Sequence, residues 1–169
     1  MTTDNKSIVP VSVDDKPILS NLMQLYLHDF SVYDGADINA QGIYAYPYLD
    51  LYWLEPTRFP FFVQIEGKYA GFILIRHGCY NFKTQKEDDN LLSIAEFFVM
   101  RKYRRQGVGV WAAKSMFDQF AGAWQVNAQK NNLPAQAFWK VMIDNYTNSH
   151  YDQFNVDEET VFQFTSPPQ

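Results

Sequence analysis

A short stretch in the middle of the chain combines one acid with a basic, glycine-containing loop. Glu96 is the single charged residue in the apolar and β-branched run Leu91–Met100, which predicts a strand buried on both faces. A carboxylate in such a strand is costly unless it is paired, hydrated or used. Glu96 is therefore a candidate general base, because a partly buried carboxyl group has a raised pKa. A structural pairing with an arginine or lysine is the open alternative.

The residues that follow this strand could bind a phosphate group. The first N–H groups of a helix lack intrahelical partners and lie at its positive end, and glycines allow close approach of an anion. Arginines add charged donors. The predicted pyrophosphate loop comprises Arg104, Arg105, Gln106, Gly107, Val108 and Gly109. An ordinary strand-to-helix turn with solvated arginines is the alternative. The spacing matches neither a Walker-type loop nor a three-glycine dinucleotide motif.

Two motifs together resemble those of the GNAT superfamily of N-acyltransferases. Arg104-x-x-Gly107-x-Gly109 resembles the family's acetyl-CoA loop, and Asn132-x-x-Ala135 resembles its motif at the start of the fourth helix. The resemblance spans nearly the whole chain. It implies a single domain over residues 1–169 with an α/β GNAT fold, a mixed central sheet of six to seven strands flanked by about four helices. It also implies acetyl-CoA as co-substrate.

The resemblance further assigns roles to individual residues. A glutamate at the position of Glu96 often serves as base, and in this chain it would act through a water molecule. Backbone N–H groups near Phe98 and Val99 would contact the coenzyme and the oxyanion. Asn132 and Trp139 would lie at the coenzyme site. Trp139 departs from the family, because many members have a tyrosine there that protonates the leaving thiolate, and an indole N–H is not a useful acid.

The sequence therefore does not identify the acid that protonates the thiolate. Either the thiolate leaves to water, or another tyrosine serves; Tyr146 and Tyr103 are the candidates, without further support from the sequence.

An aromatic segment, Ile43–Phe59, predicts the acceptor site. Its tyrosines are interspersed with carboxylates and prolines without a clear period, and tyrosine faces with carboxylates suit an amine or ammonium group. In GNAT proteins the corresponding segment lines the acceptor site. The alternative is that these aromatics cover the core. The candidate acceptor residues are His28, Asp29, Tyr44, Tyr48 and Tyr52.

The elements that must position these residues follow from periodicity and turn signals. Helices are expected from Asp14 or Asp15 to about Phe30, from the glycine loop to Gly122, and from Asn131 or Asn132 to Tyr146, with a short helix within Ile43–Phe59. Tyr80–Asn90 reads as a charged, solvated connection. The expected strands besides Leu91–Met100 are Ser7–Val13, Pro60–Glu66, Tyr69–His77, Trp124–Gln129, Thr147–Phe154 and Thr160–Phe164.

Composition limits the function classes. The 169 residues carry a formal charge of -5, which argues against nonspecific nucleic-acid binding and fits a cationic substrate. The three histidines show no metal spacing, so no metal is expected. The single cysteine, Cys79, is expected to be a small buried hydrophobe. No apolar run reaches membrane-spanning length and no signal segment begins the chain, which predicts a cytoplasmic protein. A homodimer is a further expectation.

The sequence thus predicts an acetyl-CoA-dependent N-acetyltransferase. The acetyl group would pass by direct attack to a primary amine of a small molecule or peptide, without an enzyme nucleophile. The alternative is a GNAT-fold module that binds acyl-CoA without catalysis, as a sensor or regulatory domain. The identity of Trp139 favours this alternative slightly, and Glu96 disfavours it.

Overall fold

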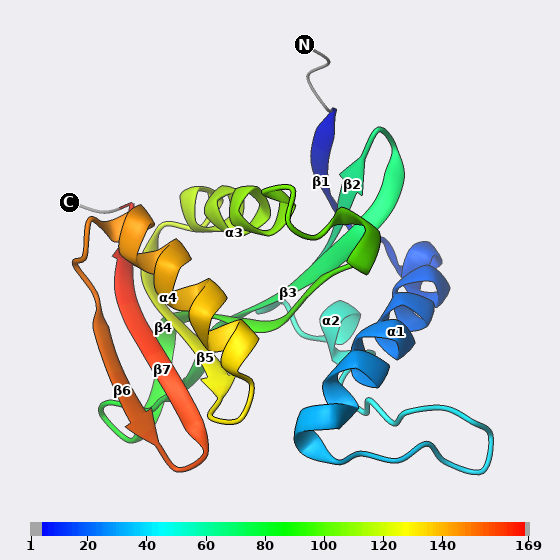
Figure 1. The fold of residues 1–169 in the computed structure, drawn as a ribbon, viewed down its shortest axis with the longest axis horizontal. Coiled ribbons are helices and arrows are strands. Elements are labelled where there is room, and N and C mark those ends of the chain that lie inside the picture. The colour runs from blue at the N-terminus through cyan, green and yellow to red at the C-terminus, as the bar shows by residue number, and fades with distance from the viewer. Residues whose placement is uncertain (1–4, 168–169) are drawn as a thin grey trace. The chain divides into compact units, whose positions relative to one another are not determined.

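The computed structural model describes residues 5–167, which form two compact units. The first unit contains the residues up to Leu74 together with Glu96–Tyr103, and the second contains Ile75–Ala95 and the residues from Arg104 onward. The described residues form one seven-stranded sheet, with strand order β1-β2-β3-β4-β5-β7-β6. With four α-helices, this confirms the predicted α/β fold (Figure 1).

The elements follow the predicted order, with several different boundaries. They are β1 (Lys6–Pro10), a 3-10 turn η1 (Val13–Asp15), α1 (Lys16–Asp34), α2 (Leu51–Leu54), β2 (Arg58–Ile65), β3 (Lys68–Asn81), β4 (Lys86–Val99), η2 (Arg101–Tyr103), α3 (Val108–Gln119), β5 (Gly122–Gln129), α4 (Leu133–Thr147), β6 (Asp152–Val156) and β7 (Glu159–Ser166).

Helix α1 is the main helix of the first unit. Pro17 lies in its first turn, where a missing N–H costs nothing. The helix ends at Gly35, whose φ of 70° is the left-handed conformation that glycine adopts easily. Its buried residues include Leu19, Leu22 and Met23. Leu25 lies outside this buried stripe, and its side chain is 49% exposed.

The backbones of β3 and β4 come very close together in the first unit. A Cβ placed on Gly71 of β3 would lie only 1.9 Å from the carbonyl oxygen of Phe98 in β4. Nearby, Met100, the residue directly after β4, donates from its backbone N to Ala70 O of β3 at 2.8 Å. Position 71 therefore admits no side chain while the end of β4 keeps this path.

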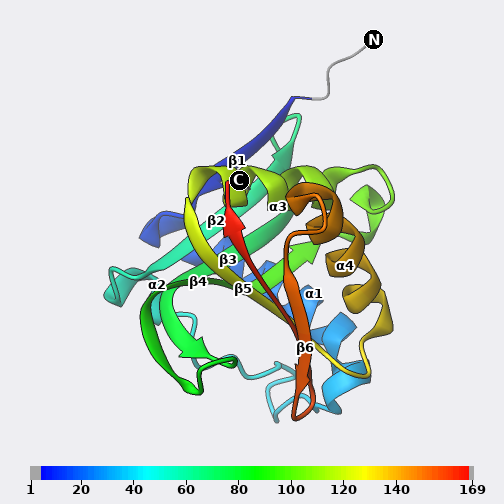
Figure 2. The ribbon, with the colours of Figure 1, turned by 90° about the vertical axis from the view of Figure 1, so that its left-hand side faces the viewer.

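The second unit contains a parallel crossover through α3. Strands β4 and β5 pair in parallel at Leu92↔Trp124 and Ser93↔Gln125. Strand β7 then pairs antiparallel with β5 from Gly122↔Ser166 to Gln129↔Glu159. The short strand β6 pairs antiparallel with β7, and Figure 2 shows this hairpin in orange and red.

Aromatic side chains fill the core of the second unit. Phe117 of α3 contacts Trp124 of β5 and Phe164 of β7, each with ring centroids 4.9 Å apart. Trp124 and Phe117 are both fully buried. Val110 is 49% exposed and lies outside the buried face of α3, which comprises Val108, Ala112, Ala113, Met116 and Phe117.

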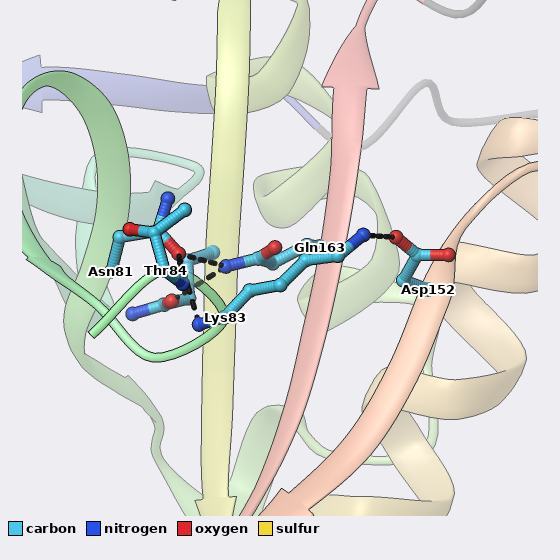
Figure 3. Close-up of polar contacts among 6 residues, drawn as sticks. Asn81, Lys83, Thr84, Asp152 and Gln163 are labelled. Carbon is cyan, nitrogen blue, oxygen red and sulfur yellow. Dashed lines mark hydrogen bonds and ion pairs between the residues drawn. The ribbon is translucent and has the colours of Figure 1, made fainter. Parts of the chain in front are cut away.

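The predicted solvated connection Tyr80–Asn90 was wrong, because most of it belongs to the long strands β3 and β4. Only a short turn separates them, and Asn81 organises it (Figure 3). Asn81 Oδ1 accepts hydrogen bonds from the backbone N–H groups of Lys83 and Thr84 and from Gln163 Nε2 of β7. Lys83 Nζ also forms a 2.5 Å ion pair with Asp152 Oδ2. The turn is thus held by side chains that come much later in the sequence.

Other boundaries differ for local reasons. Helix α4 reaches Thr147, whose Oγ1 donates to Ile143 O at 2.8 Å, and then ends at Asn148 in the left-handed conformation. The predicted strand from Thr147 therefore begins only at Asp152. Strand β1 ends at Pro10, before the turn η1. Cys79 is 5% exposed, as expected for a small buried residue.

Candidate functional site

Glu96 and Tyr26 form the centre of the first unit's polar cluster. Tyr26 Oη of α1 donates a 2.5 Å hydrogen bond to Glu96 Oε2 of β4. The Tyr26 ring is fixed by contacts with Phe30, Phe72 and Phe98, whose centroids lie 5.5, 5.7 and 5.9 Å away. The packing of the Tyr26 ring therefore holds its hydroxyl group in position toward the Glu96 carboxylate.

Burial changes the ionisation of Glu96. Desolvation raises the pKa of Glu96 from 4.5 to about 7, although the hydroxyl groups of Tyr26 and Tyr46 act in the opposite direction. Burial and the nearby Glu96 charge in turn raise the pKa of Tyr26 well above its ordinary value. At neutral pH the tyrosine thus stays protonated as a donor, and the carboxyl group is divided between its two forms. A carboxyl group of that kind can accept a proton from a substrate and release it again.

Tyr46 and Tyr52 extend this cluster. Burial, followed by the charge of Glu96, raises the pKa of Tyr46, and the same two causes raise that of Tyr52 to about 12. Tyr52 is 3% exposed, and within residues 5–167 its buried hydroxyl oxygen has no hydrogen-bond partner. Arg58 lies over the Tyr52 ring at 5.4 Å and forms an ion pair with Glu55. Of the predicted acceptor residues, Tyr52 is thus part of the Glu96 cluster.

The other acceptor tyrosines lie on the segment between α1 and α2. Tyr44 Oη lies 3.2 Å from His28 Nδ1, so the structure brings these two predicted residues together. Gln24 of α1 fixes the Tyr44 backbone from both sides, accepting from its N–H at 2.8 Å and donating to its C=O at 3.0 Å. Tyr48 is 55% exposed and contacts Tyr46 edge to face, with centroids 5.8 Å apart.

Asp29 has a different environment. Its Oδ1 forms a 2.6 Å ion pair with Arg101, the first residue of η2. This pair joins the C-terminal third of α1 to the segment that follows β4, within the first unit. The carboxylate is therefore engaged with an arginine of the chain, which makes a structural role for Asp29 at least as well supported as contact with an acceptor.

Tyr26 and Tyr46 are the site residues that the sequence analysis missed. Tyr26 reads as one more apolar position of α1, four residues after Leu22. The available signal was that a tyrosine on a buried helix face needs a partner for its hydroxyl group, and that a buried carboxylate needs donors. The sequence separation of 70 positions between Tyr26 and Glu96 hides this pairing from any local pattern.

The predicted phosphate loop lies in the second unit. Arg104–Gly107 is exposed and leads directly into α3. Gly107 occupies the position before the helix with φ of 74°, and no side chain caps this end of α3. The first-turn N–H groups, including those of Val108 and Gly109, therefore point away from the helix without an intrahelical acceptor. This geometry suits an anion, as the glycine positions predict.

The two predicted coenzyme residues of α4 have structural roles in the second unit. Asn132 precedes α4, and its Oδ1 accepts from Ala135 N at 3.1 Å, so the Asn-x-x-Ala motif is a helix cap. Trp139 is 5% exposed, and its ring contacts Phe138 at 4.8 Å and Phe117 at 6.5 Å. These contacts account for both residues without a coenzyme and leave their assignment a prediction.

The tyrosines considered as acids are engaged elsewhere. Tyr146 Oη lies 2.8 Å from both Asp118 Oδ1 and Ser166 Oγ, and Asp118 stands at the C-terminal end of α3. About ten residues, or roughly 15 Å of helix, separate that end from the phosphate loop. Tyr103 carries Lys102 Nζ 5.3 Å from its ring centre. Which group protonates the thiolate therefore stays a prediction.

Two further findings concern metals and membranes. No group of three or more His, Cys, Asp or Glu side chains in the described part of the chain could hold a metal ion. No α-helix between residues 5 and 167 combines the length and apolar character that crossing a bilayer requires.

Solved structures with the same fold are numerous. An acetyltransferase from Thermus thermophilus is 14% identical, with a TM-score of 0.72 over 98% of this chain and 99% of that chain. The aminoglycoside acetyltransferase AAC(6')-Ib in complex with coenzyme A is 10% identical, with a TM-score of 0.66 over 96% and 95%. The ribosomal-protein-S18-alanine N-acetyltransferase from Escherichia coli is 12% identical, with a TM-score of 0.58 over 95% and 93%. At these identities the likeness is one of fold.

Sequence comparison gives the family. A search of curated proteins finds no significant match. The sequence model of the acetyltransferase (GNAT) family matches residues 19–142, a range that includes the Glu96 cluster, the phosphate loop and most of α4. The chain therefore belongs to the GNAT family of acetyltransferases.

Proposed function

We propose that this protein transfers an acetyl group from acetyl-CoA to a primary amine of a small molecule or peptide, with Glu96 as general base. The observation that carries the proposal is the tyrosine-bound carboxyl group of Glu96, whose pKa of about 7 suits proton abstraction near neutrality. Glu96, the candidate base that the sequence analysis names, thus has a pKa that suits this role.

The phosphate loop supports the identity of the donor. An exposed arginine-rich loop and the uncapped N-terminus of α3 suit the pyrophosphate of coenzyme A. The solved relative in complex with coenzyme A is consistent with this donor, and Arg104, Arg105 and Gly107 are its proposed contacts.

In the proposed reaction the acetyl group passes directly from acetyl-CoA to the amine. Glu96 accepts a proton from the acceptor ammonium, either directly or through one water, and the free amine attacks the thioester carbonyl. The backbone N–H groups at Phe98 and Val99 are the proposed donors to the developing oxyanion. The amine nitrogen gains the acyl carbon and loses its second proton to solvent, the C–S bond breaks, and the thiolate takes its proton from solvent.

The acceptor is proposed to be cationic. From Pro17 to Thr57 the sequence contains Asp29, Asp34, Asp37, Asp50 and Glu55 but no lysine or arginine. This segment carries all the predicted acceptor residues, and its charge attracts an ammonium group. Solved relatives named as acting on aminoglycosides or on a ribosomal protein fit amine acceptors of either size.

Substitution of Glu96 by Gln tests the proposal. We expect Glu96→Gln to lower kcat/KM for an accepted amine by about 10²-fold or more, with release of free thiol as the readout. Coenzyme binding, measured as the rise of Tm with added CoA, should remain. Unchanged turnover would remove Glu96 from the mechanism. CoA binding by a wild-type protein that acetylates no amine in a broad screen would favour the acyl-CoA sensor instead.

A further inference from the structure

We propose that Tyr26 is the positioning residue for Glu96, fixing the orientation of the carboxylate that accepts the proton of the acceptor amine. This inference rests on the proposed function of Glu96 and adds a residue that neither the motifs nor the family match identifies. Its basis is the 2.5 Å hydrogen bond from Tyr26 Oη to Glu96 Oε2.

The first argument is geometric. A glutamate side chain has three rotatable bonds, and a base acts efficiently only when its oxygen is held near the proton that it removes. Tyr26 supplies that restraint, because its ring is packed against Phe30, Phe72 and Phe98. The hydrogen bond holds Oε2 and thereby fixes the orientation of the whole carboxylate.

The second argument concerns the groups around Glu96. Tyr26 approaches from α1, Tyr46 from the segment before α2, and Tyr52 from α2. Arg58 of β2 lies beyond Tyr52 and is paired with Glu55, and Asp34 at the end of α1 acts on Tyr26. Glu96 is therefore restrained by neutral hydroxyl donors rather than by an arginine or lysine. A neutral donor fixes the carboxylate without suppressing its basicity as fully as a cation does.

The test compares three tyrosine-to-phenylalanine variants. Tyr26→Phe keeps the packed ring and removes only the hydroxyl group. Tyr46→Phe removes the second hydroxyl group that acts on Glu96, whose influence is the smaller of the two. Tyr69→Phe is the matched control, because Tyr69 also belongs to the first unit and packs edge to face on an aromatic ring, Phe62, at 4.7 Å.

The first readout does not depend on activity. The δ-carbon of Glu96, labelled with 13C and assigned by its loss in Glu96→Gln, is titrated by NMR. Removing a donor to the charged form raises the pKa of Glu96, so we expect Tyr26→Phe to shift this titration upward by about one pH unit. Tyr46→Phe should give a smaller upward shift, and Tyr69→Phe none. An unchanged titration in Tyr26→Phe would overturn the proposal.

The second readout is a double-mutant cycle in turnover. At pH 7 we expect Tyr26→Phe to lower kcat/KM for the amine about tenfold and to move the acidic limb of the pH profile upward, with the KM for acetyl-CoA unchanged. In the Glu96→Gln background the same substitution should change the rate less than about twofold, since Tyr26 acts through Glu96. An equal loss in both backgrounds would contradict a positioning role.

The two readouts separate this inference from the proposed function. If wild-type protein acetylates no amine, the proposed function fails, while the NMR titration still decides whether Tyr26 controls Glu96. If wild-type protein is active and the titration does not move, only the role of Tyr26 is lost.

Discussion

Tyr26 Oη and Glu96 Oε2 lie 2.5 Å apart although 70 residues separate them in the sequence. The contact joins α1 to β4 and supplies the partly buried carboxyl group of Glu96 with the stronger of its two tyrosine hydrogen bonds. Its consequence is a glutamate that is fixed in place and still titrates near neutrality, and several measurable properties follow from that state.

The stability of the protein should depend on pH through Glu96. Its pKa is about 7 in the folded state against an ordinary 4.5, so between these values the folded state holds a proton that the unfolded state has lost. The free energy of unfolding therefore falls as pH rises through this window. The total change attributable to Glu96 is about 3 kcal/mol at most.

Glu96→Gln removes this dependence. We expect the variant to exceed wild type in urea denaturation at pH 8, by up to about 3 kcal/mol, and to match it near pH 4. Equal stabilities at pH 8 would show that the folded state does not raise the pKa of Glu96. Taking the difference between the two proteins cancels the contributions of all other carboxylates.

Gly107 should contribute both to the stability of the start of α3 and to coenzyme binding. Its φ is 74°, and no atom lies within 4 Å of the position that a Cβ would take, so Gly107→Ala should cost about 1 kcal/mol of stability through backbone strain alone. Gly35→Ala is the control, because Gly35 has φ of 70° and equally open surroundings. Both should unfold at similarly reduced denaturant concentrations, and only Gly107→Ala should weaken the stabilisation by CoA. A normal CoA response in Gly107→Ala would count against the loop assignment.

Gly71→Ala should be far more damaging. The new Cβ would lie 1.9 Å from Phe98 O and 2.9 Å from Phe98 C, and this backbone cannot yield as a flexible side chain can. We expect a loss of at least about 3 kcal/mol or insoluble protein on expression. Gly67→Ala, at a turn with no neighbouring atom within 4 Å, should remain soluble. A Gly71→Ala protein with wild-type stability would mean that the two strands separate readily.

Gln24 should control the segment that carries the acceptor tyrosines. Gln24→Ala removes both hydrogen bonds to the Tyr44 backbone, so the Tyr44 amide should exchange with solvent faster. The KM for the amine should rise several-fold while that for acetyl-CoA stays constant. Gln41→Ala, at an exposed position of the same segment, is the control. A constant KM for the amine would place the acceptor away from this segment.

Tyr146 should contribute to the free energy of unfolding and not to turnover. Tyr146→Phe removes the hydroxyl contacts with Asp118 and Ser166 and should cost about 1 kcal/mol. Its turnover and pH profile should match those of wild type. A tenfold loss of kcat with intact CoA binding would instead identify Tyr146 as the acid that protonates the thiolate.

The sequence predicted the order of elements well because most of them carry strong local signals. The buried strand before the phosphate loop, the glycine at its turn and the capped start of α4 were all visible in residue types. The sequence did not reveal how far the arms of the β3–β4 hairpin extend, because the first half of β4 is exposed and charged and so has the composition of a loop. Its pairing with the preceding strand is a tertiary property that composition does not record.

The candidate site was only partly visible in the sequence, and its residue roles stay predictions. Glu96 was conspicuous as a charge in an apolar strand, and the raised pKa agrees with that interpretation. Tyr26 and Tyr46 were hidden, since each becomes a site residue only through contacts with a residue far along the chain. The ion pair of Asp29 with Arg101 was likewise beyond local pattern, because a helix-end aspartate looks the same with or without a partner.

The arrangement at Asn81 has a consequence for the order of folding. Its side-chain oxygen is shared between two amides of its own turn and Gln163, which lies 82 residues later. The turn can form its local contacts early, but the full set is completed only after β7 has joined the sheet. During synthesis on the ribosome the tip of this hairpin therefore remains incompletely held until almost the entire chain has emerged.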